Sequence, residues 1–166
     1  MKSFLLTIYS DYEFHEKCGL KTALQKRFPV IDQYYFQPIE LPLSCWNTKR
    51  HQYNANCILC WIQSKIKTSL FLILTDKNLY SPGLRYVFGI GLYHKGAITS
   101  SYHLNNDINF LIKEVTHELG HVFGLPHCSL PCVMTFSNSV FEAYQKNDVF
   151  CSQCTNQIHN SVKKLH

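Results

Sequence analysis

The chain has 166 residues, of which 46% are hydrophobic and 14% aromatic. This composition supports a folded core and argues against intrinsic disorder, and the length suits one domain. The net charge of +5 comes from short, scattered basic pairs. Because these pairs form no continuous basic stripe, we expect no nucleic-acid partner.

The N-terminal apolar run, from Phe4 to Tyr9, is shorter than the apolar segment of a secretory signal. No stretch approaches the ~20 apolar residues of a membrane span. We therefore expect a cytoplasmic protein that does not contact a membrane. Because the cytosol keeps thiols reduced, the eight cysteines are better explained by metal binding than by disulfides.

In chain order, the expected elements are strand 3–9, helix 13–28, strand 30–37, loop 38–46, helix 47–66, strand 69–75, strands 86–92 and 97–103, and helix 107–123. Helical spacing of apolar residues and a stop at Pro29 support the first helix. Asn47 or Thr48 is the expected N-cap of the second helix. The apolar run 69–75 predicts a central buried strand. Together these elements predict a mixed sheet with helices packed on it, an α/β fold.

The helix 107–123 carries two histidines and a glutamate in the string His117-Glu118-Leu-Gly-His121. The histidines are four residues apart, so they lie one above the other on one face and can reach the same ion. Glu118 is displaced from that face, and its carboxylate can reach a water bound to the metal. This is the HExxH pattern of a zinc peptidase.

Gly124 marks the expected end of this helix. Glycine adopts the left-handed conformation of a helix C-terminus at little cost, so the chain can turn sharply there. The turn can bring His127 back toward the metal as a third ligand. Three neutral histidines leave a coordination position open for water, as a catalytic zinc requires.

Four cysteines crowd into the last 40 residues, in two pairs separated by 18 residues: Cys128, Cys132, Cys151 and Cys154. This spacing predicts a structural zinc site of four thiolates, with disulfides and inert buried thiols as the alternatives. The pair Cys57-Ile-Leu-Cys60 lies among apolar residues of the expected helix 47–66. For that pair we expect buried packing rather than redox or metal chemistry.

The string HELGHVFGLPHC, followed by Cys132-Val-Met134 and Cys151-x-x-Cys154, resembles the archaemetzincins, a family of metzincin-type zinc metallopeptidases. Two upstream segments, RHQYNA at 50–55 and LYSPGLRYVFG at 79–89, are also similar to the family. The resemblance therefore covers nearly the whole chain. It departs at two points. Asn78 stands where the family commonly has Asp, and three residues separate Cys128 from Cys132 where the family usually has four. The shorter loop leaves open whether all four cysteines bind the structural zinc.

The resemblance implies a single metallopeptidase domain over 1–166, an α/β (α+β) fold with a metzincin-like, mostly parallel, twisted mixed sheet. The N-terminal lobe, 1–124, would end in the active-site helix, and the C-terminal lobe, 125–166, would be stapled by a cysteine-rich zinc site. The resemblance also implies two zinc ions per chain, one catalytic and one structural. Met134 would form an apolar floor beneath the catalytic zinc.

These observations predict a monomeric zinc metallopeptidase, with aminopeptidase action as one form, that cleaves a peptide or protein substrate. Glu118 would activate a zinc-bound water for attack on the peptide bond. Segment 97–103 is the expected strand at the edge of the cleft, where an extended peptide can pair. The alternative is a non-catalytic zinc protein that uses the cleft or the cysteine-rich module to bind peptides or partners. Glu118 argues against it, since a binding protein needs no general base.

Overall fold

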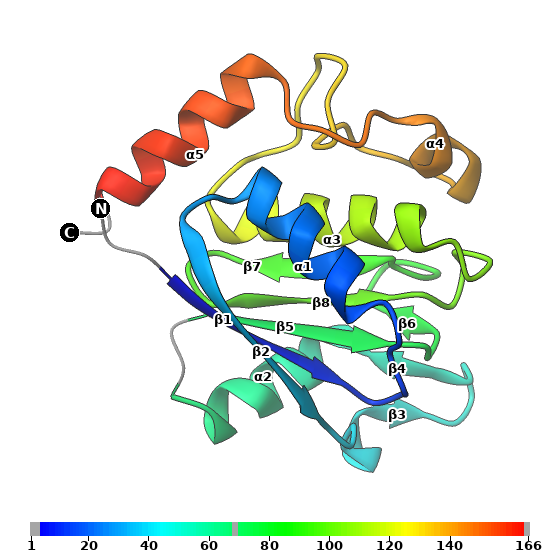
Figure 1. Cartoon of the computed structure of the whole chain (residues 1–166). Coiled ribbons are helices and arrows are strands. Elements are labelled where there is room, and N and C mark those ends of the chain that lie inside the picture. Colours follow the sequence, from blue (N-terminus) through cyan, green and yellow to red (C-terminus); the bar gives the residue numbers. More distant parts are fainter. Residues whose placement is uncertain (1–3, 68–69, 165–166) are drawn as a thin grey trace.

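The computed structural model describes residues 4–67 and 70–164, with side chains up to Ser161. The elements, shown in Figure 1, are β1 (Phe4–Ser10), α1 (Lys17–Arg27), β2 (Ile31–Pro38), η1 (Leu43–Cys45), β3 (Trp46–Asn47), β4 (Gln52–Asn54), α2 (Ala55–Lys65), β5 (Leu70–Thr75), β6 (Leu79–Tyr80), β7 (Gly89–Leu92), β8 (Gly96–Ser100), α3 (Ile108–Val122), α4 (Val140–Gln145) and α5 (Ser152–Lys164). Ser3 and Ser69, which belong to two expected strands, lie outside the described residues.

The main sheet has the strand order β2-β1-β5-β8-β7. Strand β1 is parallel to β2 and β5, and β5 is parallel to β8. Strand β7 returns antiparallel to β8 and forms the edge of the sheet beside α3. The α/β fold with a mixed, mostly parallel sheet that the sequence predicts is confirmed.

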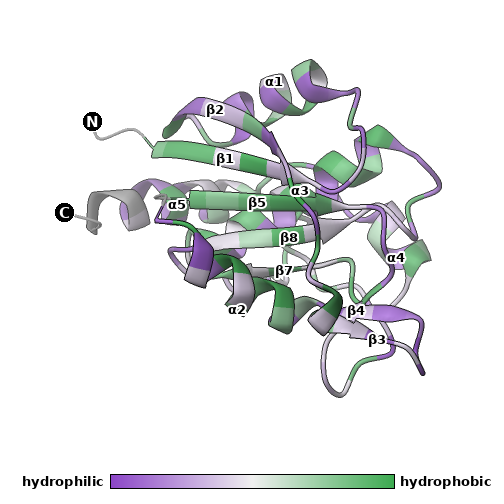
Figure 2. Ribbon diagram, turned by 90° about the horizontal axis from the view of Figure 1, so that it is seen from below, coloured by the Kyte–Doolittle hydropathy of each residue, from purple (hydrophilic) through white to green (hydrophobic). Residues whose placement is uncertain are grey.

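Helices cover both faces of this sheet, with α1 and α3 on one side and α2 on the other (Figure 1). The side chains of β5 alternate accordingly. Leu72 and Leu74 belong to the core on the α1 and α3 side, and Phe71 and Ile73 to the core on the α2 side. Every residue of β5 is buried, and β1 and β5 are largely hydrophobic in Figure 2. The expected central strand is therefore present, since a strand covered on both faces needs apolar residues at every position.

The expected helix 47–66 is wrong in its first half, where the chain instead forms a hairpin of β3 and β4. Its turn contains His51 at φ 52°, and the Asn47 side chain accepts a hydrogen bond from the amide of Arg50 at 3.1 Å. Helix α2 begins at Ala55, and Asn54 caps it by accepting from the amide of Cys57 at 3.2 Å. Strand β4 also pairs with β6 in a small second sheet that the sequence did not predict.

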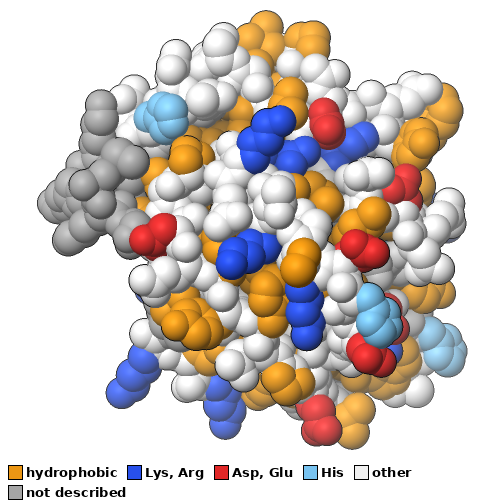
Figure 3. Space-filling model, viewed as in Figure 1, with side chains coloured by type: hydrophobic (Ala, Val, Ile, Leu, Met, Phe, Trp, Pro, Cys, Tyr) orange, Lys and Arg blue, Asp and Glu red, His pale blue; other side chains and the backbone are white. Residues whose placement is uncertain are grey.

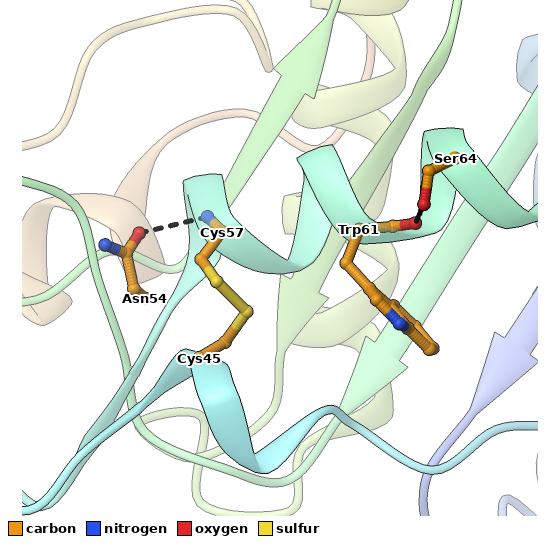
Figure 4. The surroundings of a disulfide bond; sticks show 5 residues. All are labelled: Cys45, Asn54, Cys57, Trp61 and Ser64. Carbon is orange, nitrogen blue, oxygen red and sulfur yellow. Dashed lines mark hydrogen bonds between the residues drawn. A yellow bond between two sulfur atoms is a disulfide. The ribbon is translucent and has the colours of Figure 1, made fainter.

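A disulfide joins Cys45 of η1 to Cys57 of α2, with Cα atoms 5.5 Å apart (Figure 4). The expectations that Cys57 is inert buried packing and that the cysteines stay reduced are wrong here. Because α2 starts later than expected, Cys57 lies in its first turn, where η1 can approach it. Cys60, the other member of the pair, is exposed as a free thiol.

The C-terminal segment places α4 and α5 over α3 (Figure 1). Lys113 of α3 donates to the carbonyls of Ala143, at 3.3 Å, and Tyr144 at the end of α4. A cation suits these carbonyls, which are left unpaired where a helix ends.

None of the described helices combines the length and hydropathy needed to cross a membrane. On the face shown in Figure 3, acidic, basic and hydrophobic side chains are interspersed.

Candidate active site

The helix that carries the two histidines, α3, is fixed at its start by Asp107. The Asp107 carboxylate accepts from the amides of Asn109 and Phe110, at 2.9 and 3.2 Å, as an N-cap residue does. Strands β7 and β8 lie beside the helix, which is buried along most of its length. The histidine positions are therefore set by a rigid element of the core.

The rings of His117 and His121 are each held by a backbone carbonyl. Nδ1 of His117 donates to the carbonyl of Val133, and Nδ1 of His121 donates to that of Leu125, both at 2.8 Å. Because a carbonyl can only accept, each Nδ1 carries the proton, and each neutral ring has its lone pair on Nε2.

The two Nε2 atoms face each other at 3.1 Å. Two lone pairs at this distance repel each other unless a cation lies between them. Two nitrogen ligands on a tetrahedral zinc, each at ~2.0–2.1 Å, are separated by about 3.3 Å. These two donors therefore fit a zinc ion, and their carbonyl partners are those that orient metal-binding histidines.

The third histidine returns through a turn at Gly124, which has a φ of +87°. The amide of Leu125 donates to the carbonyl of Gly120 at 3.0 Å, so the helix closes in a C-terminal capping bond. The His127 ring then lies 4.9 Å from that of His121. Each of the three histidines offers a nitrogen within 4.8 Å of the others. The structure thus brings together the three residues that the sequence proposed as ligands.

Burial lowers the pKa of all three histidines, that of His117 to about 3. The positive charge of Lys146 lowers them further. The rings are therefore neutral at neutral pH, which is the form that binds a metal.

Glu118 lines the same cavity and is only 6% exposed. Burial raises the pKa of its carboxyl to about 8, the negative charge of Glu114 adds to this, and Lys146 opposes it.

Two glycines of β7 allow the strand to lie directly against the helix. A Cβ on Gly89 would lie 2.7 Å from Cγ of Glu118, and one on Gly91 would lie 2.8 Å from Cβ of His121.

A buried ion pair beside the histidines was missed from the sequence. Nζ of Lys146 lies 3.0 Å from Oε1 of Glu114 and 3.3 Å from Nδ1 of His117, and both charged side chains are at most 4% exposed. Glu114 precedes Glu118 by one helical turn, which is a signal that could have been used. Lys146 follows α4 and carries no local signal.

Met134 packs against α3 and is fully buried. A Cβ on Gly120 would collide with its sulfur, so this glycine of the HELGH string makes room for the methionine. The Met134 carbonyl accepts from the amide of Cys128 at 2.9 Å, and its amide points to Sγ of Cys132 at 3.5 Å. Met134 therefore packs between the histidine helix and the cysteines.

The sulfur atoms of Cys128, Cys132, Cys151 and Cys154 all lie within 4.8 Å of one another. Those of Cys128 and Cys151 are 3.9 Å apart, close to the ~3.8 Å that ligands at ~2.3 Å from a tetrahedral zinc would have. The amide of Cys151 donates to Sγ of Cys132 at 3.3 Å. A hydrogen bond from the Cys154 amide lowers the pKa of Cys151 to about 7. The short loop between Cys128 and Cys132 thus still brings all four thiols together.

A cavity of about 990 Å³ opens over the histidines and Glu118. One wall consists of residues 84–91, and another of 124–127 with 136–138. The expected cleft edge, segment 97–103, is wrong, because β8 lies inside the sheet between β5 and β7. The edge strand at the cavity is β7, because the hairpin that joins it to β8 folds it back antiparallel.

Comparisons with known proteins identify the family of this chain. The model of peptidase family M54 matches residues 40–160. An archaemetzincin of Nanoarchaeum equitans is 41% identical over 123 residues, which are 74% of this chain and 72% of that protein. An archaemetzincin of Archaeoglobus fulgidus is 40% identical over 145 residues, 84% of this chain and 88% of that protein.

Solved structures show the same fold. The crystal structure of archaemetzincin from Methanopyrus kandleri matches with a TM-score of 0.87 at 28% identity, and the match covers 98% of this chain and 97% of that one. The archaemetzincin of Archaeoglobus fulgidus, complexed with malonate, matches with a TM-score of 0.79 at 31% identity, over 92% of this chain and 98% of that one. The chain therefore belongs to peptidase family M54, the archaemetzincin family of zinc metallopeptidases.

Proposed function

We propose that this chain hydrolyses peptide bonds at a zinc ion held by His117, His121 and His127. The observation that carries the proposal is the convergence of two Nε2 lone pairs at 3.1 Å, with both Nδ1 atoms already bonded to carbonyls. When bound, zinc lowers the pKa of its water toward ~7 and polarises the scissile carbonyl. A second, structural zinc would be held by the four clustered cysteines, whose sulfur spacing suits one.

In this proposal Glu118 is the general base. It lines the cavity beside the histidines, so it can take a proton from the attacking water and deliver it to the leaving amine. Burial raises the pKa of this carboxyl to about 8 in the metal-free protein, and a zinc ion bound nearby would favour the carboxylate, which is the form that accepts a proton. The substrate backbone would pair along β7, whose outer edge faces the cavity at Gly89, Ile90 and Gly91.

Aminopeptidase action is the exopeptidase form of this proposal. It would require an anionic partner for the free α-amino group of the substrate. Among the described residues that line the cavity, the acidic ones are Glu114 and Glu118. Because Glu114 is paired with Lys146, this pair is where an amino group would compete. Cleavage of free but not N-acetylated peptides would support the exopeptidase form, and equal cleavage would exclude it.

The test combines metal analysis with one substitution. We expect two zinc ions per purified chain and cleavage within a mixed peptide library. Glu118→Gln should retain both zinc ions and lose at least about 100-fold in kcat, since general-base catalysis contributes roughly 10²–10⁴-fold. Glu40→Gln, the same change at an exposed loop position, is the matched control and should behave as the wild type. Zinc without cleavage in all three proteins would favour the non-catalytic binding protein, and unchanged turnover in Glu118→Gln would exclude this base.

A further inference from the structure

The segment between β6 and β7 forms a large part of the cavity wall. Its residues 84–88, here called the wall segment, all line the cavity. The wall segment is irregular, with backbone bonds from the amide of Leu84 to the carbonyl of Ser81 and from Val87 to Leu79, each at 3.0 Å. Leu84 is 55% exposed. An irregular and partly exposed segment needs support from outside to keep one shape.

That support comes from the β3–β4 hairpin. Nη2 of Arg50 donates to the carbonyls of Leu84, at 2.8 Å, and Arg85, at 2.9 Å. Nε2 of Gln52 donates to the same Arg85 carbonyl at 2.9 Å. Two consecutive carbonyls of the wall segment are therefore held by side chains from a distant part of the sequence.

Arg50 and Gln52 are themselves fixed. Nε of Arg50 donates to Oε1 of Gln52 at 2.9 Å, and the guanidinium lies over the Tyr80 ring at 4.3 Å. Gln52 is 6% exposed, and its Nε2 also donates to Oδ1 of Asn78 at 3.1 Å. A guanidinium supplies several donors in one plane, so it can serve the Gln52 oxygen and two carbonyls at once, whereas a lysine cannot.

The network returns to the wall segment through its aromatic side chains. Oδ1 of Asn78 lies 3.2 Å from Nε2 of His103. The His103 ring packs on that of Tyr86, with centroids 4.4 Å apart, and the Tyr86 ring packs on Phe88 at 5.5 Å. The hairpin and its partners thus fix both the backbone and the ring side chains of the wall segment.

We propose that Arg50 and Gln52 are positioning residues that hold the wall segment in the shape that receives the peptide, and thereby set KM. This inference rests on the proposed peptidase function. It gives a role to the two sequence segments, 50–55 and 79–89, that the zinc chemistry leaves unexplained. A wall fixed before binding removes part of the ordering cost that binding would otherwise carry. Neither Arg50 nor Gln52 lines the cavity, so we expect the effect to fall on substrate binding rather than on the chemical step.

The first test does not depend on activity. Hydrogen–deuterium exchange is measured for the wild type, Gln52→Ala and Gln52→Glu, with Lys49→Ala in the same hairpin turn as the matched control. Gln52→Glu keeps the acceptor for Arg50 but lacks the donor to Arg85, so it separates the two contacts. We expect the amides of Leu84 and Val87 to exchange at least about 10-fold faster in both Gln52 variants. The amides of α3 should not change. Exchange in the wall segment equal to that of the wild type would overturn the proposal.

The second test is kinetic. For Arg50→Lys and both Gln52 variants we expect KM to rise about 5- to 20-fold with kcat within about twofold, because the loss is confined to binding. Zinc content should remain that of the wild type, and Lys49→Ala should leave both constants unchanged. A fall in kcat at constant KM would overturn the positioning role. If the wild type shows no turnover on any peptide, the proposed function fails, while the exchange experiment still decides whether the hairpin holds the wall.

Discussion

The histidine cluster and the cysteine cluster are built in different ways. Two of the three histidines lie on one helix, and backbone carbonyls of Val133 and Leu125 fix their rings. The cysteines come from a loop at 128–132 and from the start of α5. Hydrogen bonds from backbone amides to the sulfur of Cys132 help to arrange them. The histidines line the cavity, and among the described residues that line it there is no cysteine.

This difference indicates what a metal would do at each site. Helix α3 preforms most of the histidine site, so a metal there would add chemistry to a shape that already exists. Three of the four cysteines lie outside helices and strands, so a metal at the cysteine site would replace the missing regular structure. Cys128 directly follows His127, and Met134 is two residues after Cys132. Loss of the cysteine site should therefore disturb the histidine site. The reverse should hold much less.

The largest expected effect separates the two clusters directly. Cys132→Ser removes a fully buried thiol of the proposed structural zinc site. It should lower the free energy of unfolding by more than about 5 kcal/mol, since a structural zinc ion contributes roughly 10–16 kcal/mol of binding. His121→Gln should cost less than about 2 kcal/mol. Urea unfolding of both variants, with zinc analysis, measures the difference. Equal destabilisation would mean that the two sites are not distinct in this way.

The next effect concerns the charge of Glu118 in the metal-free protein. Its pKa is raised from 4.5 to about 8, so its contribution to stability is fully present below pH 4.5 and is lost as the pH rises through 8. Glutamine carries no charge, and Glu118→Gln should therefore gain stability relative to the wild type between pH 5 and pH 9. The gain should reach up to about 5 kcal/mol, at 1.36 kcal/mol per pKa unit.

Thermal unfolding of chelator-treated wild type and Glu118→Gln at pH 5, 7 and 9 measures this gain. With zinc bound, the gain should shrink, because the positive ion favours the carboxylate. A difference between the two proteins that does not change with pH would show that Glu118 is ionised throughout. In that case the burial of Glu118 would carry no charge-dependent cost, and this difference between the histidine site and the cysteine site would be lost.

The smallest effect concerns cysteines that lie outside both clusters. The Cys45–Cys57 bond closes a loop with a sequence separation of 12, for which chain entropy gives about 3 kcal/mol. Cys45→Ser should lower stability by about this amount under oxidising conditions and have no effect in reductant. Zinc content should not change, and Cys60→Ser is the control. A loss of zinc in Cys45→Ser would show that this disulfide supports zinc binding.

The parts of the molecule that the sequence predicted are those that local patterns specify. Asp107 and Gly124 mark the two ends of α3, and the continuous apolar run predicts β5. The turn at Gly124 that returns His127 follows from the conformational freedom of one residue, with its φ of +87°. Each of these features depends on neighbours in the sequence, so periodicity and turn chemistry are enough to find it.

The features that the sequence did not predict depend on distant partners. The residues before Ala55 have no strong strand pattern, and they become strands because β4 pairs with β6 and Arg50 bonds the wall segment. The bond between Cys45 and Cys57 requires that η1 meet the first turn of α2. Lys146 reaches Glu114 because α4 folds over α3. No local pattern encodes such pairs.

The carbonyl bonds that orient His117 and His121 have a consequence for metal selectivity. They fix two nitrogen donors before a metal arrives, and nitrogen donors of this kind also suit iron, nickel and copper. Affinity among such ions follows the Irving–Williams order rather than the demands of hydrolysis. The thiolate cluster, by contrast, favours zinc by the softness of its donors. We therefore expect competing divalent ions in excess to replace zinc at the histidines of the purified protein more readily than zinc at the cysteines.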